Sequence, residues 1–310
     1  MPTRSQSDSG VGCPISRAPF AREVGPLPDD SSTDRARNER RKALIFPREH
    51  GAWGLLLVPM ITGAGVAFRE SRNVFPVVLL LTAALALFWL RTPLESWLGT
   101  SAIHAESEEE RQTVLFVAGY LATIAALALG LLLLTGAHKD LWWIGAAAGA
   151  AFVAQAVIKK LGRWARMLSE VVGTVGLTSA APAAYYVITG KFGATAWMLW
   201  AANLLFAGNQ IHYVQVRIHT AKAANMSAKL ARGWAFALGQ VAMATALGFA
   251  CEQGFMPRLA LIAFAPLLLR GWIYFLRKPA PLVVRQLGWS ELTQAVVFCV
   301  LFITAFALAR

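Results

Sequence analysis

Long runs of hydrophobic residues follow one another from Gly51 to the end of the chain, separated by short polar stretches. Each run is close to the ~17–25 residues that an α-helix needs to cross the hydrocarbon core of a bilayer. The pattern predicts nine transmembrane helices, at residues 52–68, 74–90, 113–134, 141–158, 171–188, 194–214, 234–250, 259–276 and 292–308. We therefore expect an all-α, polytopic membrane helix bundle.

The first 45 residues have a different pattern, rich in Pro, Ser, Asp and Arg with only scattered hydrophobic positions. Such a segment buries too little apolar surface to offset the entropy lost on ordering. It predicts a disordered cytoplasmic tail at residues 1–45, followed by the transmembrane domain at 46–310.

Composition agrees, because 56% of the residues are hydrophobic and only 15% are charged, which excludes an ordinary soluble domain. The net charge of +12 does not indicate nucleic acid, since the cations lie in the tail and in short loops. Lys and Arg concentrate before the first predicted helix and at residues 159–166, 217–232 and 277–285. The positive-inside rule then places the N-terminus in the cytoplasm and the C-terminus outside, so we expect an integral protein of the cytoplasmic membrane.

Three acids lie at the cytoplasmic starts of predicted helices, namely Glu49, Glu170 and Glu291, with His50 beside the first. Helix electrostatics is one explanation, with Ser169 and Ser290 as N-caps. A second is the spacing, because 170 − 49 and 291 − 170 are both 121 residues. Equal intervals hint at a tandem repeat of four helices.

Polar residues inside the predicted spans are candidates for function, because they are costly at lipid depth. Asn209, His212 and His219 share one helical face within about 80°, provided that the helix continues through Arg217. The two histidines lie about 10 Å apart along the axis, too far to hold one metal ion, so no metal site is expected. Interhelical hydrogen bonding is the plainer role of this face.

Arginine supplies the other candidates. Arg91 either pairs with Glu95 one turn later or ends its helix at Pro93, and snorkelling to the interface would also explain it. Arg270 lies too deep for easy snorkelling, so it is the best candidate for a buried cation, with Glu170 or Glu291 as its partner.

Two further segments have structural predictions. Gly145 and Gly149 have GxxxG spacing, which favours close packing within the chain and otherwise serves dimerisation. The acidic stretch at residues 104–112 predicts a solvated, mobile loop.

Four sequence blocks resemble the YwiC-like family of bacterial integral membrane proteins. The most specific is Pro47-Arg-Glu-His-Gly-Ala-Trp-Gly-Leu-Leu-Leu-Val-Pro59, followed by Gly63. The others are Leu168-Ser-Glu-Val-Val-Gly-Thr-Val-Gly-Leu-Thr178, Tyr213-Val-Gln-Val-Arg-Ile218 and Leu287-Gly-Trp-Ser-Glu-Leu292. This resemblance implies a membrane architecture and no particular activity.

A more distant resemblance, to the UbiA superfamily of prenyltransferases, comes from the nine helices, the four-helix spacing and the polar inner ends of two predicted helices. It implies magnesium and a prenyl diphosphate held by Asp-rich motifs. Here Arg91-Thr-Pro-Leu-Glu95 and Asn209-Gln-Ile-His-Tyr-Val-Gln-Val-Arg217 stand in those places without any aspartate. Arginine binds phosphate directly, so these residues are consistent with an anionic ligand. They do not favour magnesium-dependent transfer, because the carboxylates that would bind magnesium are missing.

The sequence therefore predicts a UbiA-like bundle with a cytoplasm-facing polar cavity for an anionic lipid or prenyl diphosphate. The anion would bind Arg91, Arg217 and Arg270, and the cavity would also contain Glu49, His50, Glu170, Asn209, His212 and Glu291. If the protein is an enzyme, it is at most a divergent UbiA-like prenyltransferase that lacks the Asp-rich motifs, with His212 as the candidate acid or base. The alternatives are a small-molecule permease, with breaks at Pro59, Pro182 and Pro266, and a non-catalytic membrane assembly factor that uses the GxxxG face.

Overall fold

The computed structural model describes residues 30–47, 50–101, 103–136, 140–161, 165–221, 223–278 and 282–309, which contain helices and no strand. They are α1 (Asp30–Ile45), α2 (His50–Ala67), α3 (Phe75–Trp97), α4 (Glu108–Thr135), α5 (Leu141–Lys160), α6 (Arg166–Thr178), α7 (Ala180–Thr189), α8 (Ala194–Thr220), α9 (Met226–Glu252), the short 3₁₀ turn η2 (Arg258–Ala260), α10 (Leu261–Leu276) and α11 (Val284–Leu308). The chain divides into two compact units, Met1–Arg41 and Lys42–Arg310.

Seven of these segments are long and apolar enough to cross a membrane: α3, α4, α5, α6 together with α7, α9, η2 together with α10, and α11. α2 contributes a shorter apolar stretch, Trp53–Ala67. α8 has 27 residues, but its asparagines and glutamines make it less hydrophobic than the others. All nine predicted ranges fall on these helices, so the all-α prediction is confirmed.

Helix ends differ from the predictions in several places. α9 and α11 each begin eight residues earlier than expected, at Met226 and Val284. α6 also begins early, at Arg166, so Ser169 lies inside α6 and Ser290 inside α11, and the prediction that they are N-caps is wrong. Part of the acidic stretch also belongs to a helix, because Ser107 caps α4 in a reciprocal arrangement with Glu110.

Residues 30–45 differ from the predicted disordered tail, because they form α1. Arg, Lys, Glu, Ala and Leu in its second half are all good helix formers, and local propensity therefore favours a helix there. Residues 1–29 lie outside the described residues.

The predicted helix 171–188 is broken at Ser179 into α6 and α7. Pro182 is the physical cause, because it has no N–H to donate to the carbonyl of Thr178 four residues earlier. In contrast, α3 continues through Pro93 to Trp97, and α2 and α10 continue through Pro59 and Pro266.

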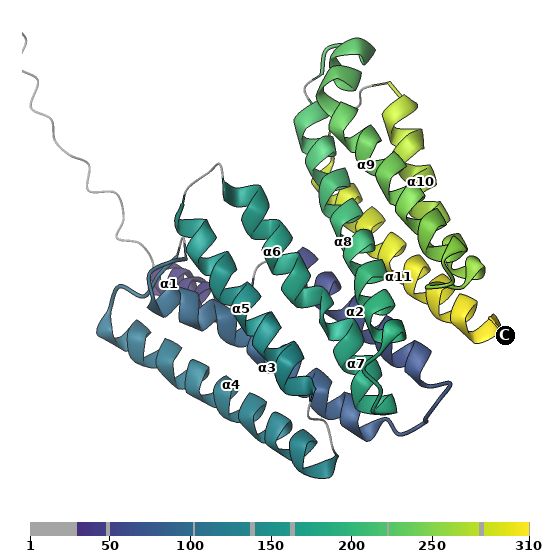
Figure 1. Cartoon of the computed structure of the whole chain (residues 1–310). Coiled ribbons are helices and arrows are strands. Elements are labelled where there is room, and N and C mark those ends of the chain that lie inside the picture. The colour runs from purple at the N-terminus through teal and green to yellow at the C-terminus, as the bar shows by residue number, and fades with distance from the viewer. Residues whose placement is uncertain are drawn as a thin grey trace, which may run out of the picture. The chain divides into compact units, whose positions relative to one another are not determined.

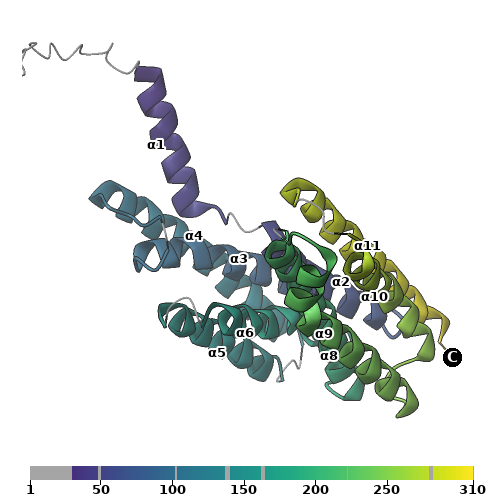
Figure 2. The same ribbon diagram turned by 90° about the horizontal axis from the view of Figure 1, so that it is seen from above.

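α2 and α7 pack together as a central pair, with α3–α6 on one side and α8–α11 on the other (Figures 1 and 2). Gly63 makes the close approach, because a Cβ there would lie 2.2 Å from the carbonyl oxygen of Ala181 in α7. We call α3–α6 the cavity half and α8–α11 the aromatic half. The aromatic half packs around stacked rings, including Phe206 and Phe298 with centroids 4.1 Å apart.

Candidate functional site

A cavity of about 670 Å³ lies mainly among α3, α5, α6 and α7. Its lining is hydrophobic or glycine except for Arg91, Gln155 and Ser179. The hydrophobic lining comes from leucines and alanines of several helices, with Phe88, Phe152 and Trp142 among the aromatic residues. This volume and character are typical of a small-molecule or lipid site.

The glycines of α5 open this cavity instead of closing a helix contact. A Cβ at Gly145 or at Gly149 would meet no atom within 4 Å, and both glycines line the cavity. The prediction of close intrachain packing through this GxxxG face is therefore wrong. α5 packs on α6 through other positions, because a Cβ at Gly173 would collide with Gln155 and one at Gly176 would lie 3.0 Å from the Ala151 Cβ.

Arg91 gives the cavity a charged end. Its Nε lies 3.0 Å from Glu95 Oε1, and the same oxygen accepts from Lys159 Nζ at 3.2 Å. The i,i+4 alternative for Arg91 and Glu95 is confirmed, and the helix does not end at Pro93. The carboxylate of Glu95 thus holds two cations beside an apolar cavity.

The aromatic half contains a second arginine–carboxylate pair, which is about as enclosed as the first. Arg270 Nη1 lies 2.5 Å from Glu291 Oε1, and its Nη2 lies 3.3 Å from Oε2. The Arg270 side chain is 12% exposed, and its guanidinium stacks 3.9 Å from the centre of the Tyr213 ring. The prediction that Glu291 is a partner of Arg270 is confirmed. Glu170 instead accepts from Gln215 Nε2 at 2.8 Å, which joins α6 to α8.

Two more cations lie over the ring of a second tyrosine, Tyr274. Arg217 Cζ lies 4.7 Å and Lys229 Nζ 4.0 Å from the centre of the Tyr274 ring. Lys229 is fully buried and donates to the carbonyls of Tyr274 and Arg277, at the end of α10. The sequence pattern predicted a loop at Arg217 and Lys229. This prediction is wrong, because Arg217 belongs to α8 and Lys229 to α9.

Asn209 and His212 lie on α8, which continues through Arg217 to Thr220. The condition for Asn209, His212 and His219 to share one helical face is therefore met. Asn209 is buried, and His212 packs edge-to-face on Phe236 of α9 with ring centres 5.3 Å apart. His219, at the end of the same face, is exposed. Four buried polar atoms in this half have no hydrogen-bond partner: Asn209 Oδ1, Gln240 Nε2, Gln240 Oε1 and Arg270 Nε.

The predicted site residues thus fall into separate groups. Arg91 lines the cavity, whereas Arg217, Arg270 and Glu291 surround Tyr213 and Tyr274 in the aromatic half. Glu49 lies outside the described residues, and so does the side chain of His50. Within the described ranges, no group of three or more His, Cys, Asp or Glu side chains is placed to hold a metal ion.

Sequence reasoning missed Tyr213, Tyr274, Lys229 and Gln240. Gln240 had a visible signal, because it is an isolated amide within the apolar run 234–250. Tyr274 is one helical turn after Arg270 and therefore shares its face, which was a weaker signal.

The seven long apolar helices define an integral, multi-pass membrane protein. Residues 46–185 match the family model described as YwiC-like protein, which confirms the resemblance over that stretch. The match contains the first two sequence blocks, whereas the blocks at 213–218 and 287–292 lie beyond it. Comparison with curated proteins found no match, and comparison with solved structures found none either.

Proposed function

We propose that this protein binds an amphipathic anionic ligand, such as an anionic lipid or a prenyl diphosphate, in the cavity of α3–α7. One observation carries the proposal: an apolar cavity of about 670 Å³ has Arg91 in its wall. The hydrocarbon part would lie among leucines and alanines. The anion would bind Arg91 and Lys159, since arginine forks match carboxylate and phosphate oxygens without a metal bridge.

The family match supports this location. Every lining residue of the cavity lies between Leu56 and Ala183, and the match covers residues 46–185. The segment that resembles the family is therefore the segment that builds the cavity. Arg217, Arg270, His212 and Glu291 lie after it, and a catalytic role of His212 stays a separate prediction.

We further propose nine membrane spans, with the N-terminus in the cytoplasm of a bacterial inner membrane and a UbiA-like arrangement. Chain direction then assigns the ends of α3, α5 and α8 and the starts of α6, α9 and α11 to the cytoplasmic side. Arg91, Lys159, Glu170, Arg217, Lys229 and Glu291 all lie at these ends. Their common placement follows the positive-inside rule and would orient the cavity's charged end toward the cytoplasm.

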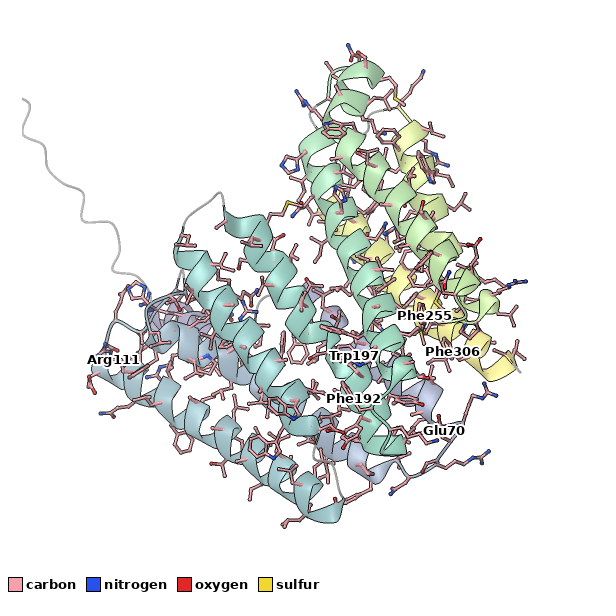
Figure 3. The ribbon with its side chains drawn as sticks, viewed as in Figure 1. Glu70, Arg111, Phe192, Trp197, Phe255 and Phe306 are labelled. Atoms are coloured by element: carbon pink, nitrogen blue, oxygen red, sulfur yellow. The ribbon has the colours of Figure 1, made fainter. Side chains whose placement is uncertain are left out.

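Lipid analysis of the purified protein tests the binding proposal. Arg91→Gln should lower the amount of co-purifying anionic amphipath about tenfold, because one charge-assisted hydrogen bond is worth about 1.5–3 kcal/mol. Arg111→Gln is the matched control, since Arg111 is an exposed cation at the start of α4 and does not line the cavity (Figure 3). Equal anionic lipid in wild type and Arg91→Gln would contradict the proposal.

A small-molecule permease is the second candidate, favoured by the four buried polar atoms without partners in α8–α10. Such atoms are costly and often mark polar pathways in membrane proteins. Solute accumulation that requires sealed vesicles and fails in Gln240→Leu would support the permease. The third reading, an assembly factor that uses the Gly145/Gly149 face, stays a separate prediction.

A further inference from the structure

We propose that the carboxylate of Glu95 occupies the anion site of the cavity, that the head of the ligand displaces it, and that Gln155 is a further binding residue for that head. The inference rests on the proposed function, because it describes how the same cavity exchanges one anion for another. Three observations carry it: the bridging position of Glu95, the enclosure of Arg91 and the place of Gln155 in the cavity wall.

One carboxylate oxygen joins the two cations that border the cavity. Glu95 Oε1 lies 3.0 Å from Arg91 Nε and 3.2 Å from Lys159 Nζ. An oxygen of a carboxylate or phosphate head could make the same contacts, since it too accepts charge-assisted hydrogen bonds. Glu95 therefore has the chemistry of the ligand's own head, and the two anions compete for the same donors.

Arg91 is too enclosed to lose its negative partner without a replacement. Its side chain is 12% exposed, and it has an interaction besides the one with Glu95. An enclosed cation left without its partner is strongly unfavourable. An anion can therefore reach Arg91 only by exchange, so that the guanidinium is paired before and after the ligand binds.

Glu95 is placed to leave, because it lies in the last turn of α3, which ends at Trp97. Its side chain is 21% exposed, and the side chain of its second partner, Lys159, is 39% exposed. A carboxylate that turns toward water at the helix end regains its hydration, whereas Arg91 lies one turn further in, beside an apolar lining. The two cations then remain at the edge of the cavity for the incoming head.

Gln155 adds a neutral donor at the depth of Arg91. It lies one turn before Lys159 on α5, as Arg91 lies one turn before Glu95 on α3. Because Lys159 and Glu95 join the two helices, Arg91 and Gln155 belong to the next layer into the cavity, and both line it. Gly173 of α6 makes room for this amide, since a Cβ there would lie 2.2 Å from Gln155 Nε2.

The test measures the binding of phosphatidic acid and of diacylglycerol to the delipidated full-length protein in a non-ionic detergent, by native mass spectrometry. The two probes share their hydrocarbon part and differ in the phosphate. Glu95→Gln should bind phosphatidic acid about tenfold more tightly than wild type, because it removes the competing charge and keeps the shape of the side chain. Diacylglycerol should bind both proteins equally.

Glu108→Gln is the matched control, because Glu108 is an exposed acid at the start of α4 and does not line the cavity. It should leave the binding of phosphatidic acid unchanged. Adding Arg91→Gln to Glu95→Gln should abolish the gain, since the gain requires the donors that Glu95 releases. Glu95→Asp is a second variant that keeps a charge for folding, draws it away from Arg91, and should show a smaller gain in the same direction.

Gln155→Met should weaken the binding of phosphatidic acid about tenfold and leave diacylglycerol unaffected, because methionine keeps the length of the side chain and removes the amide. Thermal unfolding of each variant shows whether it is folded. Unchanged binding of phosphatidic acid by folded Gln155→Met would remove Gln155 from the site.

The exchange of anions would be overturned if folded Glu95→Gln and Glu95→Asp bound phosphatidic acid no more tightly than wild type, since an acid that only positions the two cations gives that result. The proposed function would still stand if Arg91→Gln weakened binding. If phosphatidic acid binds neither wild type nor Glu95→Gln, both proposals fail.

Discussion

The two halves of the bundle place the same residue types in different surroundings. Each has an arginine–glutamate pair, Arg91 with Glu95 in the cavity half and Arg270 with Glu291 in the aromatic half. The first pair borders an apolar cavity and shares its acid with an exposed lysine. The second is enclosed by Tyr213 and by α11. Both arginines are 12% exposed, so the two pairs differ in what lies beside them, an apolar cavity in one case and an aromatic ring in the other.

The glycines show the same contrast. Gly145 and Gly149 of the cavity half face open space, whereas a Cβ at Gly239 or Gly271 of the aromatic half would touch His212 or Gln240 at about 3 Å. Small residues in membrane helices thus do not by themselves indicate close packing. They create room, and the neighbouring helix either occupies it or does not.

The largest effect that we expect separates the two ion pairs. Arg270→Met should lower the free energy of unfolding by about 3–5 kcal/mol, because it leaves the Glu291 carboxylate enclosed without its partner. Arg91→Met should cost only about 1 kcal/mol, because Glu95 keeps Lys159. Denaturation in detergent measures both. Replacing both members, with Arg270→Met and Glu291→Leu together, should recover most of the loss. Equal destabilisation by the two single variants would remove the distinction.

The central pair that joins the halves gives the next effect. Gly63→Ala should lower the free energy of unfolding by about 1–3 kcal/mol, because its Cβ would collide with the backbone of Ala181. Gly54→Ala in the same helix meets nothing within 4 Å and should be neutral or slightly stabilising. Thermal unfolding of both variants checks this, and equal midpoints would show that α2 and α7 are further apart.

Two glutamines in the aromatic half should respond with opposite signs. Gln240→Leu should raise the free energy of unfolding by about 1 kcal/mol, since it removes two buried polar atoms without partners. Gln210→Leu should lower it by about the same amount, because Gln210 Nε2 donates to the carbonyl of Glu291 at 3.1 Å. A loss of stability in Gln240→Leu would show that its amide has partners in the membrane.

The smallest effect lies at the opposite end of the bundle, where Glu70 sits in the loop after α2 (Figure 3). Its carboxylate accepts from Lys191 Nζ at 2.7 Å and from Tyr185 Oη at 2.6 Å. The hydrogen bond from Lys191, followed by that from Tyr185, lowers the pKa of Glu70 below its ordinary value of 4.5.

A depressed carboxyl pKa stabilises the folded state above pH 4.5, and the contribution disappears as the pH falls through the folded-state pKa. The side chains of Glu70 and Lys191 are 37% and 71% exposed, so we expect their ion pair to contribute less than about 1 kcal/mol to the free energy of unfolding. Unfolding midpoints of wild type and Glu70→Gln should therefore differ slightly at pH 7 and converge as the pH falls below the lowered pKa of Glu70. A constant difference across this range would exclude the ionised carboxylate as the cause.

The sequence alone predicted the positions of the apolar helices well, because hydrophobic length is a strong local signal. It also gave Glu291 as one of two partners for Arg270, since a cation that deep in an apolar helix requires a partner. Lys229 was misplaced because it lies only five residues before the predicted start at 234, where lysines usually belong to loops. Its true role depends on the end of α10, some 45 residues later.

The cavity was not predictable in the same way. A Gly-x-x-x-Gly pattern looks the same in the sequence whether it faces a neighbouring helix or open space. Only the arrangement of the helices decides between the two. The break at Ser179 was partly visible through Pro182, whereas Pro93 shows that the same residue type leaves another helix continuous.

The contact of Arg69 with α11 can form only late in the synthesis of the helix bundle. Its guanidinium donates to the carbonyls of Phe306 and Ala309, so the loop after α2 contacts the last turn of α11. Domains begin to form from the N-terminus while the ribosome is still adding residues. The partners of Arg69 lie 237 and 240 residues later in the chain, so this contact forms only after the whole of α2–α11 has been synthesised.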